Sequence, residues 1–457
     1  MVLVIKRRRV YTAYSRRLGT IVQTVLRLLQ KLTLVLAPGV YARVRRAVHA
    51  MVAANKLSQS VRYHDGLPGV APLNAVIDPA LSSSPTLNVL LPGMSMKAMS
   101  GGPNTVINLV YRLAAQGVRL RFISTDIPAD ADHASLFQHF ADLTQLPVNL
   151  PNVSIACGFD RSKPLMLGAN DRFIASAWWN VQMIKRLLPL TQNGEFFYII
   201  QDFEPGLYAW STRYALALET YSLNYRPILC SNLLAEYMVA NHVGRFAEDA
   251  FVKKALVFEP AVDGTKFYPE ESRGDQRIRR LLFYARPTMA ERNLFELGLY
   301  ALRTATELGY FDGDDWEMLF IGEQVPDVTL GRDCRIQAAG WLDYAQYAAL
   351  MRSSDIVLSL MLSPHTSYPP IEAAASGAIA VTNVFANKTG EALARLSPNL
   401  VGVAPSLEGV VEGLRVATER VRISAVSRQP ANVPVDWAQS FMPCLAPLLQ
   451  ALSDCRN

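Results

Sequence analysis

The chain has 457 residues, more than one hydrophobic core usually supports, so its length predicts two domains with additional segments. Half of the residues are apolar and 18% are charged, which excludes a disordered or a fibrous protein. The formal net charge of +6 is unevenly distributed, because residues 1–64 contain 13 Lys or Arg and no Asp or Glu.

Residues 1–80 are predicted to form a basic N-terminal arm and a linker. Arg27, Gln30 and Lys31 interrupt its apolar stretch, so we expect neither a membrane-spanning helix nor a secretory signal. Two interpretations stay open: a basic amphipathic helix in peripheral contact with the anionic inner membrane, or a solvated or partner-packed helix. Nucleic acid is not expected as a partner, because no aromatic platform or binding motif accompanies the positive charge.

The next segment, residues 81–258, alternates buried strands with amphipathic helices. Residues 85–93 predict a strand, and the apolar spacing after Pro103 predicts a helix. Gly101 and Gly102 therefore lie between a strand end and a helix start, where backbone N–H groups can approach a phosphate or sugar. An ordinary turn is the alternative. The pattern is not GxGxxG, which disfavours a dehydrogenase.

Polar residues follow a later strand of this domain, predicted at residues 196–201. Asp202 and Glu204 come directly after it, and the carboxyl ends of parallel strands are where open α/β sheets bind ligands. Both are candidates for binding the hydroxyl groups of a sugar acceptor, and Asp202 is also a candidate base. A solvated turn or a helix N-cap is the alternative for each.

Residues 259–430 repeat the pattern of strands and helices and predict a second domain. Two domains of this kind imply parallel sheets that face each other across a cleft. Arg286 follows a strand directly and Arg292 comes six residues later, so their guanidinium groups are candidates to bind a diphosphate. The alternative is surface ion pairing with Glu291 or Glu296.

The stretch "SPHTSYPPIEAAASGAIAVTN", residues 363–383, combines a polar loop, a helix and a buried strand. The loop follows a strand and is expected to enter the cleft. Two prolines suit the start of the helix, and Glu372 is expected in its first turn, where the helix dipole favours a carboxylate.

In this order, the motifs resemble those of retaining GT-B glycosyltransferases, the superfamily of glycogen synthases and mannosyltransferases. They are most similar to bacterial rhamnosyltransferases of S-layer glycan and rhamnose-rich O-antigen assembly. The resemblance extends over residues 85–425 and rests on "GGPNTVINLVYRLAAQG", "YIIQDFEPGLY", "YARPTMAERN" and "SPHTSYPPIEAAASGAIAVTN". It implies an α/β GT-B fold with two Rossmann-like doubly wound domains. It also implies that residues 431–457 form a helix that crosses back to the first domain.

The resemblance further implies a nucleoside-diphosphate donor, dTDP-rhamnose, and a glycan or lipid-linked glycan acceptor, with retention at the anomeric carbon and no metal or cofactor. Glu372 then contacts the ribose of the donor. The family has a second Glu eight positions earlier, where this chain has Pro364. His365, Ser367 and Tyr368 are the candidates to contact the donor in its place.

By the same resemblance, Trp341 and Leu342 lie at the nucleotide base, although the Trp341 ring has a core position as its alternative. Arg286 and Arg292 stabilise the departing diphosphate. Asp202 is a lesser candidate for a catalytic base, because the leaving diphosphate itself can accept the proton.

Two other functions stay open from the sequence. The missing Glu is compatible with a catalytically silent sugar-nucleotide-binding or scaffold subunit, and a doubly wound architecture also suits an epimerase or hydrolase. The acidic run at residues 312–315 precedes a strand and is interpreted as a solvated turn rather than a metal site. The five cysteines show neither a CxxC pair nor zinc-finger spacing, so we expect no disulfide framework, no structural metal and a cytoplasmic location.

Overall fold

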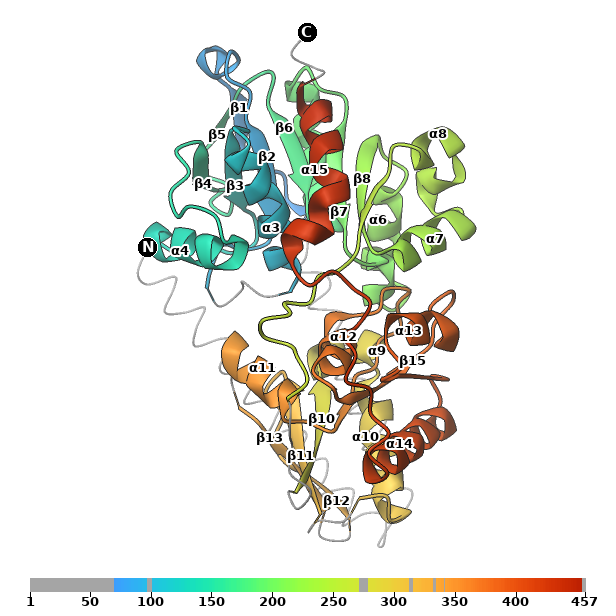
Figure 1. Ribbon diagram of the computed structural model, residues 1–457. Helices are drawn as coiled ribbons and strands as arrows, with labels where there is room; N and C mark the ends of the chain where they lie inside the picture. The colour runs from blue at the N-terminus through green and yellow to red at the C-terminus, as the bar shows by residue number, and fades with distance from the viewer. Residues whose placement is uncertain are drawn as a thin grey trace, which may run out of the picture. The chain divides into compact units, whose positions relative to one another are not determined.

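The computed structural model describes residues 70–96, 101–270, 278–311, 315–331, 334–340 and 342–453 (Figure 1). The predicted basic arm, Trp341 and most of the acidic run at 312–315 lie outside these residues. None of the helices formed by the described residues is long and apolar enough to cross a membrane.

The first lobe, residues 72–258, contains a seven-stranded parallel sheet with the order β4-β3-β2-β6-β7-β8-β9. A short parallel pair, β1 (Ala75–Ile77) and β5 (Leu165–Leu167), lies beside it. The strands of the sheet are β2 (Leu87–Leu91), β3 (Leu120–Ser124), β4 (Val153–Cys157), β6 (Arg172–Ala175), β7 (Phe196–Ile200), β8 (Tyr225–Cys230) and β9 (Leu256–Phe258). The helices are α3 (Gly102–Ala115), α4 (His133–Thr144), α5 (Trp178–Leu187), α6 (Thr212–Thr220), α7 (Asn232–Ala240) and α8 (Asp249–Val252).

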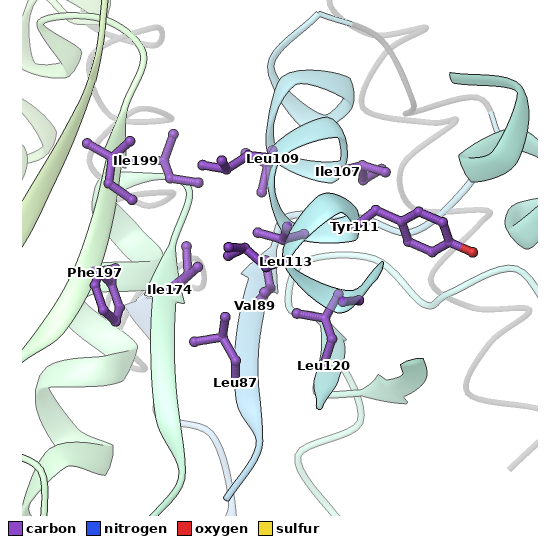
Figure 2. Packing of buried hydrophobic residues seen from close by; sticks show 14 of the residues in the cluster. Leu87, Val89, Ile107, Leu109, Tyr111, Leu113, Leu120, Ile174, Phe197 and Ile199 are labelled. Atoms are coloured by element: carbon purple, nitrogen blue, oxygen red, sulfur yellow. The ribbon is translucent and has the colours of Figure 1, made fainter. Parts of the chain in front are cut away.

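The central strands β2 and β7 are buried along their whole length, because helices cover both faces of the sheet. Figure 2 shows Leu109 and Leu113 of α3 directed at the side chains of β2, β6 and β7. Tyr111 points to the side opposite β6 and β7, and its hydroxyl donates to the carbonyls of Pro147 and Val148 at 2.8 Å. Helix α3 is therefore fixed both to the sheet and to the segment that follows α4, and its N-terminus lies at Gly102.

The second lobe, residues 278–430, contains a sheet with the order β12-β13-β11-β10-β14-β15-β16, in which β12 alone is antiparallel to its neighbour. The strands are β10 (Arg279–Ala285), β11 (Trp316–Gly322), β12 (Val328–Gly331), β13 (Cys334–Ala338), β14 (Ile356–Leu358), β15 (Ile379–Asn383) and β16 (Leu400–Val403). The helices are α9 (Ala290–Asn293), α10 (Phe295–Glu307), α11 (Tyr344–Arg352), α12 (Tyr368–Ala375), α13 (Gly390–Leu396) and α14 (Leu407–Arg422). Each lobe is thus a doubly wound α/β unit.

The last helix, α15 (Trp437–Ser453), follows the second lobe in the chain but packs on the first lobe. Phe441, Cys444 and Leu448 are buried in the same core as α3, and the Phe441 ring lies 4.8 Å from the ring of Phe258 in β9. Figure 1 shows α15, coloured red, along the face of the first-lobe sheet. The chain therefore passes from the first lobe to the second and returns.

Helix α12 begins at Tyr368 with prolines in its first turn, as predicted. Glu372 is its fifth residue, so the expectation that it lies in the first turn is wrong by one residue. The helix starts earlier than expected because Tyr368 itself takes helical geometry ahead of the two prolines, whose fixed φ suits the next two positions.

Candidate functional site

Asp202 and Arg292 form an ion pair between the two lobes. Asp202 follows β7 of the first lobe, Arg292 lies in α9 of the second, and Ser363 follows β14 in the second lobe. One carboxylate oxygen of Asp202 accepts from the Arg292 guanidinium and the other from the Ser363 hydroxyl. The side chains of Arg292 and Asp202 are only 14% and 9% exposed. For Arg292, the alternative of a surface ion pair is therefore wrong.

The environment of Asp202 keeps its side chain ionised. Burial raises the pKa of this carboxyl, but the charge of Arg292, the interaction with His365 and the hydrogen bond from Ser363 outweigh burial and bring the pKa below its usual value. Asp202 is consequently an acceptor-only group at neutral pH, with both oxygens engaged.

Arg286 has a different carboxylate partner. It precedes the short 3-10 helix at Pro287–Met289, and its Nε lies 3.5 Å from Glu323, at the end of β11. Its side chain is 35% exposed, and the pair with Glu323 is of the surface kind considered from the sequence, with a different glutamate. The charges of Arg286 and Arg292 both act on the buried hydroxyl of Tyr284, whose pKa burial raises and these two charges lower. Both guanidinium groups thus lie near one strand end.

His365 is buried and held as a neutral imidazole. Its Nδ1 accepts from the backbone N–H of Ser367 at 2.9 Å, so the ring proton belongs on Nε2, which lies 3.4 Å from the Cys230 sulfur. Burial lowers the pKa of His365 to about 4, and the charges of Arg292 and Lys388 contribute, against the opposing effect of Asp202. His365 therefore presents an N–H donor, to which a thiol is only a weak acceptor.

Ser367 has a left-handed backbone, with φ 69°, which is uncommon for a residue with a side chain. This conformation turns its N–H toward the His365 ring. Strained residues persist where surrounding contacts determine them, and they concentrate at functional sites. The polar loop 363–368 is therefore fixed in shape.

Tyr368 connects this loop to the glycine turn of the first lobe. Its hydroxyl lies 3.0 Å from the hydroxyl of Thr105 in α3, and the Thr105 hydroxyl also lies 3.2 Å from the carbonyl of Gly101, to which it donates. Gly101 precedes α3 with φ 46°, a conformation that favours glycine. A Cβ on Gly102 would meet the Gln201 amide at 3.2 Å. The structure thus brings the predicted glycine turn and the predicted loop together.

Lys388, which the sequence reasoning missed, is fully buried beside the same loop. Its ammonium donates to the carbonyls of Met361 at 3.0 Å and His365 at 3.5 Å. Burial lowers its pKa to about 7, with Asp202 and Arg292 acting in opposite directions. Lys388 and Cys230 each come within a few residues of a strand's carboxyl end, so the rule that singled out Asp202 also applies to them.

Glu372 lies in a separate group of tyrosines. One of its oxygens accepts from the Tyr347 hydroxyl of α11 at 2.7 Å, and burial raises the pKa of Glu372 to about 7. The neighbouring Tyr344 ring carries the Lys266 ammonium 5.2 Å from its centroid. Contact of Glu372 with a ribose stays a prediction.

Glu204 serves the start of a helix. Its carboxylate accepts from the backbone N–H of Trp178, the first residue of α5, at 2.6 Å, and only 6% of the residue is exposed. Burial raises the pKa of Glu204 to about 8. Glu204 is not an N-cap residue itself, since Ala177 occupies that position of α5, but its side chain accepts from the first N–H of the helix. A role in binding an acceptor stays a prediction.

Leu342 is half-buried against the core of the second lobe, while Trp341 lies outside the described residues. Within the parts of the chain that the structure describes, no three His, Cys, Asp or Glu side chains gather as they would around a metal ion. Base recognition near residue 341 stays a prediction.

Comparison with known proteins identifies the chain's relatives. Two family models match it, "WsaF, N-terminal domain" over residues 86–232 and "WsaF, C-terminal domain" over residues 279–415. The O-antigen biosynthesis protein RfbC of Myxococcus xanthus is 36% identical over 218 residues. The match covers 48% of this chain but only 16% of RfbC, so the chain spans a small part of that relative's length.

Two solved structures are similar over most of the chain. WaaG, a glycosyltransferase involved in lipopolysaccharide biosynthesis, has a TM-score of 0.47 and 11% identity, covering 81% of this chain and 99% of its own. Sucrose-phosphate synthase from Thermosynechococcus elongatus has a TM-score of 0.46 and 13% identity, covering 81% and 98%. Because the two WsaF models together span more than half of the chain, one in each lobe, the chain belongs to the WsaF family.

Proposed function

We propose that the protein transfers rhamnose from dTDP-rhamnose to a growing glycan of the bacterial surface, with retention at the anomeric carbon and without a metal. The observation that carries the proposal is that Asp202 of the first lobe interacts with both Arg292 and His365 of the second lobe. Membership of the WsaF family and the likeness to an O-antigen biosynthesis protein support the class of acceptor.

Transfer requires stabilisation of the charge that develops on the departing diphosphate. Arg292 and Arg286 lie near one strand end and supply fixed positive charge, and the start of α3 adds backbone N–H groups beside Gly101. Arg292 is engaged by Asp202, so a bound diphosphate competes with this carboxylate for the guanidinium. Binding of the donor then frees an Asp202 oxygen to accept the hydrogen bond of an acceptor hydroxyl.

The sugar itself meets neutral donors. Nε2–H of His365 lies against a thiol, a weak acceptor that a rhamnose hydroxyl can replace. In the transfer step the bond from the anomeric carbon to the diphosphate breaks and the bond to the acceptor oxygen forms. The acceptor proton passes to the leaving diphosphate, so attack on the same face requires no separate base.

A donor titration tests the proposal. Calorimetry with dTDP-rhamnose, dTDP, UDP-glucose and GDP-mannose is expected to show the tightest binding for dTDP-rhamnose, and Arg292→Ala is expected to weaken it by at least about tenfold. NMR of the product then reports the anomeric configuration. Absence of binding by every donor would overturn the assignment.

The second candidate is a catalytically silent subunit that binds sugar nucleotide. It is favoured by the absence of a carboxylate at Pro364, where the family has Glu. Release of dTDP that depends on added glycan acceptor contradicts this candidate, whereas donor binding without turnover supports it. Conversion of the donor sugar without any acceptor would instead indicate an epimerase.

We also propose that transfer takes place in the cytoplasm, with residues 1–64 in contact with the anionic inner membrane. Their excess of Lys and Arg supports this contact, because each basic residue near such a surface contributes about 1 kcal/mol. Co-sedimentation with phosphatidylglycerol vesicles is expected for the full chain, and its loss is expected when residues 1–64 are deleted. Equal sedimentation of both proteins would contradict this role.

A further inference from the structure

Trp210 is 92% exposed, although large aromatic side chains are usually mostly buried. It lies in the short segment between the 3-10 helix at Glu204–Leu207 and α6. A single exposed apolar side chain is normal, so Trp210 points to a contact surface only together with the aromatic side chains around it.

The surroundings of Trp210 hold it in place. Its ring stacks on Tyr214 of α6, with centroids 6.1 Å apart and planes at 25°. Ser211 caps α6 by accepting from the Tyr214 N–H at 3.3 Å. The Arg213 guanidinium lies 5.8 Å from the centroid of the Tyr208 ring. We call Tyr208, Trp210, Arg213 and Tyr214 the aromatic ledge.

The ledge is continuous with the proposed acceptor side of the site. The Tyr208 hydroxyl accepts from the indole N–H of Trp178 at 3.0 Å, and the backbone N–H of Trp178 donates to Glu204. The 3-10 helix that begins at Glu204 contacts α9, which carries Arg292. Asp202 and the aromatic ledge therefore belong to the same loop region. A saccharide that ends at Asp202 can extend along this region to the ledge.

We propose that the aromatic ledge binds the saccharide chain of the acceptor, beyond the sugar residue that receives the transferred group. This inference rests on the proposed function. A pyranose ring offers an apolar C–H face that stacks on an indole, and the methyl group of a 6-deoxysugar enlarges that face. Arg213 supplies hydrogen-bond donors for the hydroxyls at the edge of the ring.

The composition of the ledge favours a saccharide over a lipid surface. Ser211, Thr212 and Arg213 are exposed directly beside Trp210, so the indole is flanked by polar groups. A membrane-inserted surface places several large apolar side chains together, whereas the three residues that follow Trp210 are polar and exposed.

The test compares acceptors of two lengths, a rhamnose tetrasaccharide glycoside and the monosaccharide methyl rhamnoside, at saturating dTDP-rhamnose. Trp210→Ala is expected to raise KM for the tetrasaccharide about 5- to 10-fold and to leave KM for the monosaccharide within about twofold. Trp210→Phe, which keeps a stacking ring, is expected to give an intermediate KM. Tyr300→Ala, on the 63% exposed aromatic of α10, is the matched control and leaves both constants unchanged.

Binding without donor gives a second readout, by saturation-transfer NMR with the tetrasaccharide and by co-sedimentation with phosphatidylglycerol vesicles. Loss of the tetrasaccharide signal in Trp210→Ala supports the ledge even if the protein transfers no rhamnose, in which case only the proposed function fails. Transfer with an unchanged tetrasaccharide KM overturns the ledge alone. Loss of vesicle binding with intact tetrasaccharide binding also overturns it, in favour of a lipid contact.

Discussion

Replacing Arg292 with Ala removes the cation that balances Asp202 between the lobes. Breaking a buried ion pair by removing one partner costs about 3–5 kcal/mol. The two side chains are still 14% and 9% exposed, so water can solvate the remaining charge in part. We therefore expect the free energy of unfolding to fall by about 2 kcal/mol. For domains of this size such a loss lowers Tm by about 4–8 °C, measured by differential scanning fluorimetry.

Arg286→Ala is the matched control for this effect. Arg286 and Glu323 are separated by 3.5 Å and are 35% and 25% exposed. Pairs with this degree of exposure contribute about 0–1 kcal/mol, so Tm is expected to change by less than about 4 °C. Equal loss of Tm in the two variants would refute the reasoning.

A double variant isolates the charge of Asp202. In Arg292→Ala the carboxylate is buried without its cation, so adding Asp202→Asn is expected to recover most of the lost Tm. If the double variant is less stable than Arg292→Ala alone, the loss comes from packing of the arginine stem and not from the unpaired charge.

The deficit of Arg292→Ala also depends on pH. In the wild type, burial raises the pKa of Asp202, but its partners, Arg292 first, bring the pKa below the usual value. The ion pair therefore stabilises the fold above about pH 4, and this stabilisation is lost only in acid. Without Arg292, burial prevails and raises the pKa of Asp202, so the Tm lost in Arg292→Ala increases with pH. Lys388, with a pKa of about 7, becomes charged beside Asp202 as pH falls. His365 stays neutral above about pH 4. A deficit at pH 6 as large as at pH 8 would contradict this account.

Three further predictions concern the donor site. Burial raises the pKa of Glu372 to about 7, so the contribution of this carboxyl to stability is complete below its unfolded pKa and is lost as pH rises through 7. The free energy of unfolding of Glu372→Gln should therefore increase relative to wild type between pH 5.5 and 8, by up to about 2 kcal/mol, and a constant difference would contradict the burial. His365→Ala should weaken dTDP-rhamnose about tenfold in calorimetry while dTDP stays within about threefold, and an equal loss for both ligands would place His365 away from the sugar. Gly101→Ala and Gly117→Ala both place Cβ at positive φ with nothing within 4 Å, so each should cost about 1 kcal/mol, but only Gly101→Ala should weaken dTDP-rhamnose.

Family membership and the structure confirm the α/β GT-B fold that the motifs predicted. The local pattern of apolar residues was sufficient to predict these strands and helices. Apolar runs that are buried on both faces, and helices such as α3 with one face on a sheet, produce periodicities visible in the chain itself. The same reasoning placed Asp202, Arg292 and His365 at strand ends or helix starts, because ligands of such sheets bind at those edges.

The tertiary structure alone decided which of these residues meet. Asp202 and Arg292 are 90 positions apart and belong to different sheets, so no spacing rule joins them. Packing also placed the Glu204 side chain against the first N–H of α5, and it buried His365 as a neutral ring beside Cys230. Ion partners, tautomers and pKa shifts depend on distances across loops and between lobes. Secondary-structure periodicity extends only along one element, and it therefore carries no information about those distances.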